Sequence, residues 1–375
     1  MSHRDQLYQW RDTIREYLSH LSRSEAYVLA LWSLGMVLAK SCATSQIALF
    51  WSEAFEQPFN TLRQRLREFY FEKKKKRGKK RRDLDVTLCF APLLKWVLAL
   101  WHGERLALAL DATTLGEHFS VLVISVLYGN CAIPVAWRVL HAKKKGAWRD
   151  EWLTMLQKLA PAVPKNMETI VLCDRGLYAR WLFEQIVELG WHPFLRVNIG
   201  GTFRPQGQSA SQAMGRICPL GQAWSGRGIA FQKAARLECT LLACWHPRCK
   251  DPWLILTDYA PEEADACWYR LRCWIEQGFK VLKSGGWQWQ DTHMSDPSRV
   301  ERIWLAMAIS TLHCVSLGQV AEGEISGPMR AFRRGMVRIL LLFLRGEPTI
   351  LADLVPEAWD LEGPKSWEII HSRVT

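Results

Sequence analysis

The chain has 375 residues, 49% of them hydrophobic and 23% charged, so it is long enough for two or three globular domains and is not intrinsically disordered. Lysine and arginine outnumber aspartate and glutamate by 49 to 37, a net charge of +12 that favours a polyanionic partner, either nucleic acid or an anionic membrane surface. The eleven cysteines form no repeated Cys-x-x-Cys pattern, which excludes a zinc ribbon or a disulfide framework and indicates a reducing compartment. The N-terminus is too polar for a secretory signal, and the longest apolar stretches, residues 26–39 and 303–315, are too short to span a membrane. We therefore expect a cytoplasmic protein without a membrane partner.

Residues 1–72 are predicted to form a helical N-terminal domain. Apolar and aromatic side chains such as Leu7, Trp10 and Ile14 recur every three or four positions, and one glycine and one proline are the only residues of these types in the segment.

A basic run, KKKKRGKKRR, follows at residues 73–82 and carries +9 of the net charge of +12. Such a run cannot pack into a core, so it is either a solvated linker or an arm that contacts DNA phosphates, and we predict the arm. The predicted phosphate contacts are Lys73, Lys74, Lys75, Lys76, Arg77, Lys79, Lys80, Arg81 and Arg82.

Residues 83–198 alternate between strand and helix patterns. Strands are predicted at 105–110, 119–127, 133–139, 168–173 and 192–197, with helices at 148–159 and 178–189. The resulting order β-β-β-α-β-α-β describes a mixed sheet flanked by helices, which is an α/β domain.

The rest of the chain is predicted to complete this domain around an insertion. Residues 199–258 are rich in glycine and short alternating runs, which indicates a β-rich insertion that ends in a strand at 253–257. Helices are expected at 261–283, 300–317 and 336–344. The second part of the α/β domain then covers 259–325, and a C-terminal helical region covers 326–375. Arg330, Arg333, Arg334 and Arg338 of this region are lesser candidates for DNA contact, and the alternative is that they are ordinary surface charges.

Three acidic residues stand where α/β domains place functional groups. Asp111 follows the apolar run at 106–110, Asp174 follows the run at 168–173, and Glu276 lies on the predicted helix 261–283. Charged residues at strand ends point into the crevice where such sheets bind ligands, and three carboxylates would suit Mg²⁺ or Mn²⁺. The alternative is that each aspartate only caps a strand or begins a turn.

The predicted helix 261–283 also carries a polar stripe. Its members are Tyr269, Arg272, Glu276 and Lys283, whose spacings of 3, 4 and 7 place them within an arc of roughly 60° on one helical face. A stripe of this kind is either a solvated face of ion pairs or part of a functional site.

These residues resemble a known family. The pattern Tyr269-x2-Arg272-x3-Glu276-x6-Lys283 matches the Y-R-E-K signature of bacterial insertion-sequence transposases of the insertion-sequence-4 type, and Asp111-Ala-Thr and Asp174-Arg-Gly resemble the two Asp motifs of that family. The resemblance covers roughly residues 105–320, with the three motifs in the family's order. It implies a DDE transposase with an RNase H-like fold and a β-rich insertion between the second Asp and the Glu.

The resemblance also implies the chemistry. Asp111, Asp174 and Glu276 are expected to bind two divalent ions, Mg²⁺ or Mn²⁺, for an in-line phosphodiester displacement by water and then by a 3′-hydroxyl. Tyr269, Arg272 and Lys283 are expected to hold phosphates of the transposon end. Trp253 opens the strand before the signature and is expected to stack on a flipped base in members that cut through a DNA hairpin. Trp224, Trp245 and Trp268 are the competing candidates for that role.

The predicted function is transposition of an insertion sequence. The enzyme would bind double-stranded DNA at terminal inverted repeats, act as a homodimer on paired ends and associate with the bacterial nucleoid. The family resemblance also implies that the helical domain 1–72 binds DNA. Two alternatives stay open: a host nuclease of the same fold without strand transfer, and a catalytically dead DNA-binding protein derived from a transposase.

Overall fold

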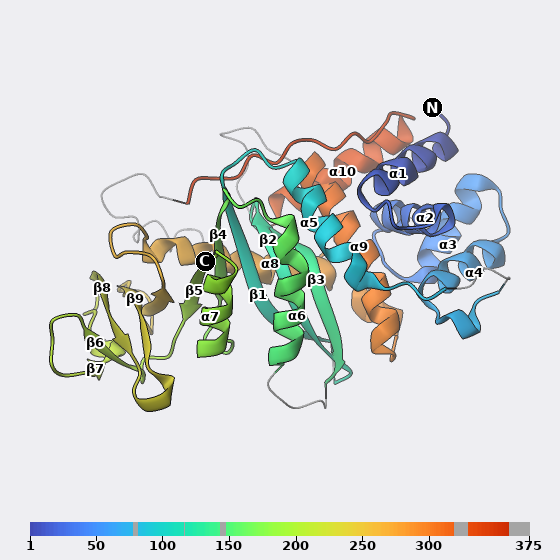
Figure 1. The fold of residues 1–375 in the computed structure, drawn as a ribbon. Helices are drawn as coiled ribbons and strands as arrows, with labels where there is room; N and C mark the ends of the chain where they lie inside the picture. The colour runs from blue at the N-terminus through green and yellow to red at the C-terminus, as the bar shows by residue number, and fades with distance from the viewer. Residues whose placement is uncertain (78–81, 116, 143–147, 319–328, 360–375) are drawn as a thin grey trace. The chain divides into compact units, whose positions relative to one another are not determined.

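The computed structural model describes residues 1–77, 82–115, 117–142, 148–318 and 329–359 (Figure 1). The chain divides into two compact units, each built from separate stretches of sequence. The first unit contains Met1–Gly103, Ala112–Pro164 and Trp274–Pro356. The second contains Glu104–Asp111, Lys165–Cys273 and the C-terminal residues from Glu357 onward.

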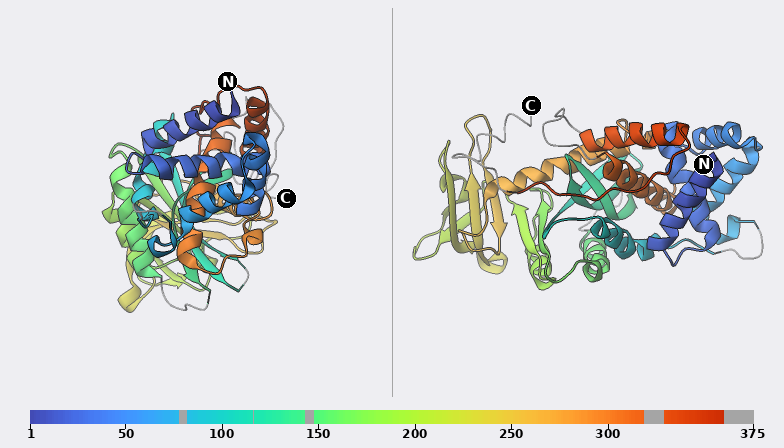
Figure 2. Two further views of the ribbon diagram at one scale, coloured as in Figure 1. Left: turned by 90° about the vertical axis from the view of Figure 1, so that its right-hand side faces the viewer. Right: turned by 90° about the horizontal axis from the view of Figure 1, so that it is seen from above.

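Four helices open the first unit, as predicted (blue in Figure 2). They are α1 (His3–Tyr17), α2 (Arg23–Ala39), α3 (Thr44–Phe55) and α4 (Phe59–Tyr70). Ser2 and Ser22 each begin a capping box that satisfies first-turn N–H groups of α1 and α2. The apolar stripe of α1 is buried, so the periodicity of its sequence correctly predicted which face packs into the core.

The remaining helices of the first unit surround a β-hairpin. They are α5 (Phe90–Ala99), α6 (Arg149–Leu159), α8 (Cys273–Leu282, from its second residue), α9 (Pro297–Leu317) and α10 (Arg330–Leu344). The hairpin pairs β2 (Phe119–Tyr128) with β3 (Cys131–His141) across a turn in which Gly129 and Asn130 both have positive φ. Every residue of β2 is buried, which explains its unbroken apolar sequence.

Helix α9 lies at the centre of the first unit. The Trp137 indole of β3 donates to the backbone carbonyl of Glu301 at 2.9 Å, and the Glu301 carboxylate accepts the Val139 N–H at 2.9 Å. By length and composition α9 could cross a membrane, but 94% of its most apolar window is buried inside the protein. Burial to this extent is typical of a core helix, which agrees with the sequence-based expectation.

Strand β1 (Arg105–Leu115) contributes residues to both units, because Glu104–Asp111 belongs to the second and Ala112–Pro164 to the first. The order of the mixed sheet is β3-β2-β1 in the first unit and β1-β4-β5-β10-β9-β8-β6-β7 in the second. Strands β4 (Glu168–Cys173) and β5 (His192–Arg196) run parallel to β1 and are connected by α7 (Arg180–Glu188). The predicted α/β order and the RNase H-like class with its N-terminal helices are confirmed.

The insertion forms antiparallel strands that extend the same sheet. They are β6 (Thr202–Pro205), β7 (Gln212–Ala213), β8 (Ala223–Ala230), β9 (Leu237–Cys244) and β10 (Trp253–Thr257). Strand β10 pairs with β5 on one side and with β9 on the other. The β-rich insertion is therefore confirmed, and its last strand lies directly beside the parallel strands that carry the aspartates.

The structure corrects three predicted elements. The helix expected at 261–283 is replaced by a 3₁₀ segment, η6 (Ala266–Arg272), followed by the short helix α8. Strand β1 continues past Asp111 to Leu115, so Asp111 lies within the strand and not at its end. Helix α10 begins at Arg330, six residues before the expected start.

Candidate active site

Strand register places three charged residues of the second unit in one row. Leu110 of β1 is paired with Cys173 of β4, and Cys173 is paired with Leu195 of β5. The residues that directly follow Leu110, Cys173 and Leu195 in the chain are Asp111, Asp174 and Arg196. Because the three strands are parallel and adjacent, these residues lie side by side at the carboxyl edge, where α/β sheets place their ligand sites.

Arg272, the last residue of η6, joins the two aspartates. Its Nη2 lies 2.6 Å from Asp111 Oδ2 and 3.5 Å from Asp174 Oδ2. The two carboxylate oxygens are therefore at most about 6 Å apart, because 2.6 and 3.5 Å add to 6.1 Å. The side chains of Arg272 and Asp111 are only 13% and 14% exposed, so this pair is shielded from solvent.

Tyr269 supports the Asp174 strand from the same 3₁₀ segment. Its ring is 3% exposed, and its hydroxyl donates at 3.2 Å to the carbonyl of Cys173, the residue before Asp174. Burial raises the pKa of the Tyr269 hydroxyl, so it stays protonated and keeps this donor. Tyr269, a predicted phosphate contact, therefore binds the backbone of β4 through its hydroxyl.

Trp253 packs on the edge of Tyr269. The two rings meet at 5.5 Å with an angle of 71° between their planes. Trp253 is the first residue of β10 and is half-buried, so part of its ring remains accessible. The prediction that Trp253 begins a strand beside the signature residues is confirmed. Its stacking on a flipped base stays a prediction.

Glu276 and Lys283 lie in the first unit. Glu276 is an exposed residue in the first turn of α8, and Lys283 directly follows the last turn. Burial lowers the pKa of the Lys283 ammonium group. Only three residues separate Glu276 from Arg272, so the two Cα atoms are no more than about 14 Å apart.

The 3₁₀ conformation of η6 changes the predicted stripe. Tyr269 and Arg272 do not share one face of an α-helix with Glu276, because the α-helix begins only at Cys273. Four consecutive residues of η6, from Ala266 to Tyr269, are buried, which a one-faced helix does not allow. The prediction of a single α-helical face was therefore wrong for Tyr269 and Arg272, which lie in a 3₁₀ segment.

The sequence also matches a known family. Residues 103–312 match the family described as the transposase DDE domain, which is more than half of the chain. The chain belongs to the DDE transposase family. Membership implies a DNA-cleaving or DNA-transferring activity, and divalent metals are the usual cofactors of the family.

Comparison with other proteins adds one solved structure. The transposase is similar to a chain in the cryo-EM structure of a piggyBac transposase synaptic complex with hairpin DNA, with 12% sequence identity and a TM-score of 0.38. The similarity covers 87% of this chain and 73% of that chain. No curated protein matches the transposase significantly.

Two cations of this transposase were missed by sequence reasoning. Arg196 follows Leu195 at the end of β5 and donates at 3.5 Å to the carbonyl of Pro252, and burial lowers its pKa. Arg175 directly follows Asp174 and pairs with Asp251 at 3.1 Å. Arg196 could have been found, because it follows an apolar run of a predicted strand in the way that the two aspartates do.

The C-terminal segment of the transposase anchors η6. Arg270 donates to the carbonyl of Ala358 at 3.2 Å and to that of Trp359. Trp359 is 4% exposed and packs edge-on against Trp268, and the Arg105 guanidinium lies over both rings at 5.2 and 5.3 Å. Because η6 carries Tyr269 and Arg272, these contacts fix the segment that holds the aspartates.

The competing tryptophans have other packing partners. Trp268 is 2% exposed and stacks on Phe194 at 5.8 Å, which is a core position. Trp224 meets Phe203 edge-on at 5.9 Å, and the Trp245 indole donates to the carbonyl of Cys249 at 3.1 Å. Trp253 is the tryptophan whose ring packs edge-on against Tyr269 at 5.5 Å.

The two ends of the basic run 73–82 are held by hydrogen bonds and an ion pair. The backbone N–H of Lys73 donates to Asp83 Oδ1 at 2.6 Å, and Arg82 pairs with Glu25 of α2. Lys73, Lys74, Lys75 and Arg77 are exposed, whereas Lys76 is half-buried and donates to the carbonyl of Arg82 at 2.7 Å. Lys79, Lys80 and Arg81 lie outside the described residues. Hydrogen bonds thus join the two ends of the basic run, which the charge pattern alone did not predict.

Proposed function

We propose that this transposase uses Asp111, Asp174 and Glu276 as ligands for divalent ions, Mg²⁺ or Mn²⁺, with two ions per active site. The observation that supports the proposal is the row of two aspartates on adjacent parallel strands, both within 3.5 Å of one guanidinium nitrogen. In the part of the chain that the structure describes, no three Asp, Glu, His or Cys side chains are grouped as a metal site. The proposal therefore includes the approach of Glu276 and an exchange of Arg272 for the metal.

The donor set fits such ions. Two carboxylates and one guanidinium leave a net negative charge of one in a partly buried place, and oxygen ligands suit Mg²⁺ and Mn²⁺. A divalent ion bound there would activate water or a 3′-hydroxyl and stabilise the leaving oxygen of the phosphodiester.

The neighbouring side chains have roles that follow from their contacts. Arg272 lies between the aspartates and can turn its planar guanidinium to a phosphate of the DNA strand once they are neutralised. Arg196 and Lys283 are further candidates for phosphate contact. Tyr269 acts as a positioning residue, because its buried hydroxyl holds the carbonyl next to Asp174.

The DNA partner is the finer part of the proposal. We assign duplex DNA carrying the terminal inverted repeats of an insertion sequence, bound by a homodimer with the N-terminal helices and the basic run 73–82. Cut-and-paste transposition through a hairpin is supported by the half-buried Trp253 beside Tyr269, where a flipped base would find an aromatic face. A cytoplasmic, nucleoid-associated location goes with this partner.

A strand-transfer assay tests this function. A labelled duplex carrying DNA that flanks the gene is incubated with the full chain, Mg²⁺ and a supercoiled plasmid. Joining of the label to the plasmid supports the proposal. Nicking without joining would instead identify a nuclease on this fold, and binding without nicking a DNA-binding protein with an inactive site.

A further inference from the structure

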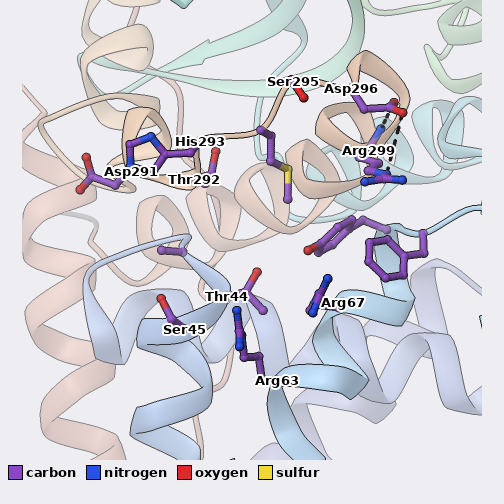
Figure 3. A pocket seen from close by; sticks show the side chains of 14 residues that line it. Thr44, Ser45, Arg63, Arg67, Asp291, Thr292, His293, Ser295, Asp296 and Arg299 are labelled. Carbon is purple, nitrogen blue, oxygen red and sulfur yellow. Dashed lines mark hydrogen bonds and ion pairs between the residues drawn. The ribbon is translucent and has the colours of Figure 1, made fainter. Parts of the chain in front are cut away.

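The first unit contains a cavity of about 400 Å³ that is distant in sequence from the aspartates (Figure 3). Three elements form it: the N-terminal turn of α3, the last two turns of α4, and the loop between η7 (Trp289–Thr292) and α9. All of its lining residues belong to the first unit, whereas Asp111 and Asp174 belong to the second.

Two arginines give the cavity its charge. Arg63 and Arg67 are one turn apart on α4, and both side chains point into the cavity (Figure 3). Neither forms an ion pair with any residue that the structure describes, and the Arg67 guanidinium lies over the Phe71 ring at 5.2 Å. Both guanidinium groups therefore keep their N–H donors for a ligand.

The other charges of the lining are largely matched. Arg299 donates two hydrogen bonds to Glu72, at 3.1 and 3.2 Å, which hold the pKa of that carboxyl at about 2. Asp296 caps α9 by accepting the N–H of Ser298 and of Arg299. Asp291 is the remaining carboxylate, and it lies on the opposite side of the cavity from Arg67 (Figure 3).

The α3 side of the cavity supplies further donors. The helix begins at Thr44, and its cap residue Ala43 has no side-chain group that could accept the first-turn N–H groups. Thr44 and Ser45 add two hydroxyls to the lining. Guanidinium, hydroxyl and backbone N–H donors thus converge on one space, a set that suits a tetrahedral oxyanion.

We propose that this cavity binds a backbone phosphate of duplex DNA. The proposal rests on the proposed function, because a transposase acts on DNA. Its location supports a polymer over a free anion: Phe71 lines the cavity and the exposed Lys73 begins the basic run two residues later. DNA held by the run would pass beside the cavity.

The test compares three single substitutions on one helix. Arg63→Gln and Arg67→Gln remove a cavity cation, and Arg65→Gln removes the same charge from a guanidinium that lies over Tyr27 at 5.6 Å, outside the cavity lining. Binding of an arbitrary duplex of about 40 base pairs is measured by fluorescence anisotropy over a range of KCl concentrations, in EDTA so that no cleavage occurs. Thermal melts confirm that all three variants are folded.

The expected result is a change in salt dependence. Loss of one phosphate contact lowers the slope of log Kd against log salt by about 0.9. Between about 50 and 200 mM salt, the Kd of Arg63→Gln and that of Arg67→Gln should therefore rise by a factor about fourfold smaller than the factor for wild type. Arg65→Gln keeps the wild-type slope. Equal slopes for all three variants would overturn the inference. A wild-type chain that binds normally in EDTA but does not nick a transposon-end duplex in a separate assay with Mg²⁺ would overturn only the proposed function.

Discussion

Removing the guanidinium between the two aspartates should destabilise the second unit. In Arg272→Gln the carboxylates of Asp111 and Asp174 stay close together without their shared cation. At an effective dielectric constant of about 20, unit charges at the observed 2.6 and 3.5 Å attract by about 6 and 5 kcal/mol before desolvation. Breaking a buried pair costs about 3–5 kcal/mol and an exposed pair about 0–1 kcal/mol.

The exposure of the pair places the expected cost between these limits. Arg272 and Asp111 are 13% and 14% exposed and Asp174 is 39% exposed, so we expect a loss of about 2–4 kcal/mol in the free energy of unfolding. The matched control is Arg175→Gln, whose partner pair is 42% and 29% exposed and should cost less than about 1 kcal/mol.

The assay is urea denaturation in EDTA, repeated with Mg²⁺. Because Mg²⁺ would replace the missing cation, it should restore more stability to Arg272→Gln than to wild type. Equal stability of the Arg272 and Arg175 variants, or no difference in their response to Mg²⁺, would refute the reasoning that the guanidinium neutralises a metal-binding carboxylate pair.

Three further predictions follow from other packing contacts. His313 is fully buried against Trp10, and burial lowers its pKa from 6.5 to about 3. Its contribution to the free energy of unfolding is therefore complete above pH 6.5, and about 2 kcal/mol of it is lost by pH 5. Urea denaturation of His313→Phe should lack this loss, and a pH dependence unchanged from wild type would contradict the prediction. Gly278→Ala should lower stability by about 1 kcal/mol despite better helix propensity, because the new methyl would lie 2.7 Å from the Ala132 Cβ, and a higher melting temperature would show that α8 is not held there. Trp253→Ala should impair hairpin formation or resolution on a gel while first-strand nicking persists, and equal loss of both steps would indicate a folding role.

The positions of the two aspartates could be predicted because they depend on strand periodicity. Apolar runs of the right length ended at Asp111 and Asp174, and parallel strands bring such ends to one edge of a sheet. Arg196 occupies the next place in the same row, and the same rule would have found it if cations had been considered beside carboxylates.

The 3₁₀ segment could not be predicted from the same kind of pattern. Its spacing fits an α-helix, but tertiary packing buries every side of it, with Trp268 against Phe194 and Tyr269 against Trp253. Its anchor, Trp359, is almost ninety residues further along the chain. The contacts that select the conformation are thus long-range, which local periodicity does not record.

The hydrogen bonds that join the two ends of the basic run are a second feature that local sequence patterns did not predict. Net charge correctly marked residues 73–82 as unable to enter a core, yet the single acidic residue Asp83 holds the backbone of Lys73. The cavity cations Arg63 and Arg67 also have ordinary helical spacing, and the cavity that they line is completed by α3 and by the loop before α9. Charge patterns therefore located the basic segments but not the local structure around them.

Nicking assays with Mg²⁺ on a duplex that carries the transposon end test whether Asp111, Asp174 and Glu276 form the active site. The variants are Asp111→Asn, Asp174→Asn and Glu276→Gln. The matched control is Asp258→Asn, which removes a half-buried carboxylate paired with His192 at 3.1 Å, outside the aspartate row. We expect the wild type and the control to nick the duplex and the three variants to bind it without nicking. Nicking by any of the three at the wild-type rate would contradict the assignment of the site.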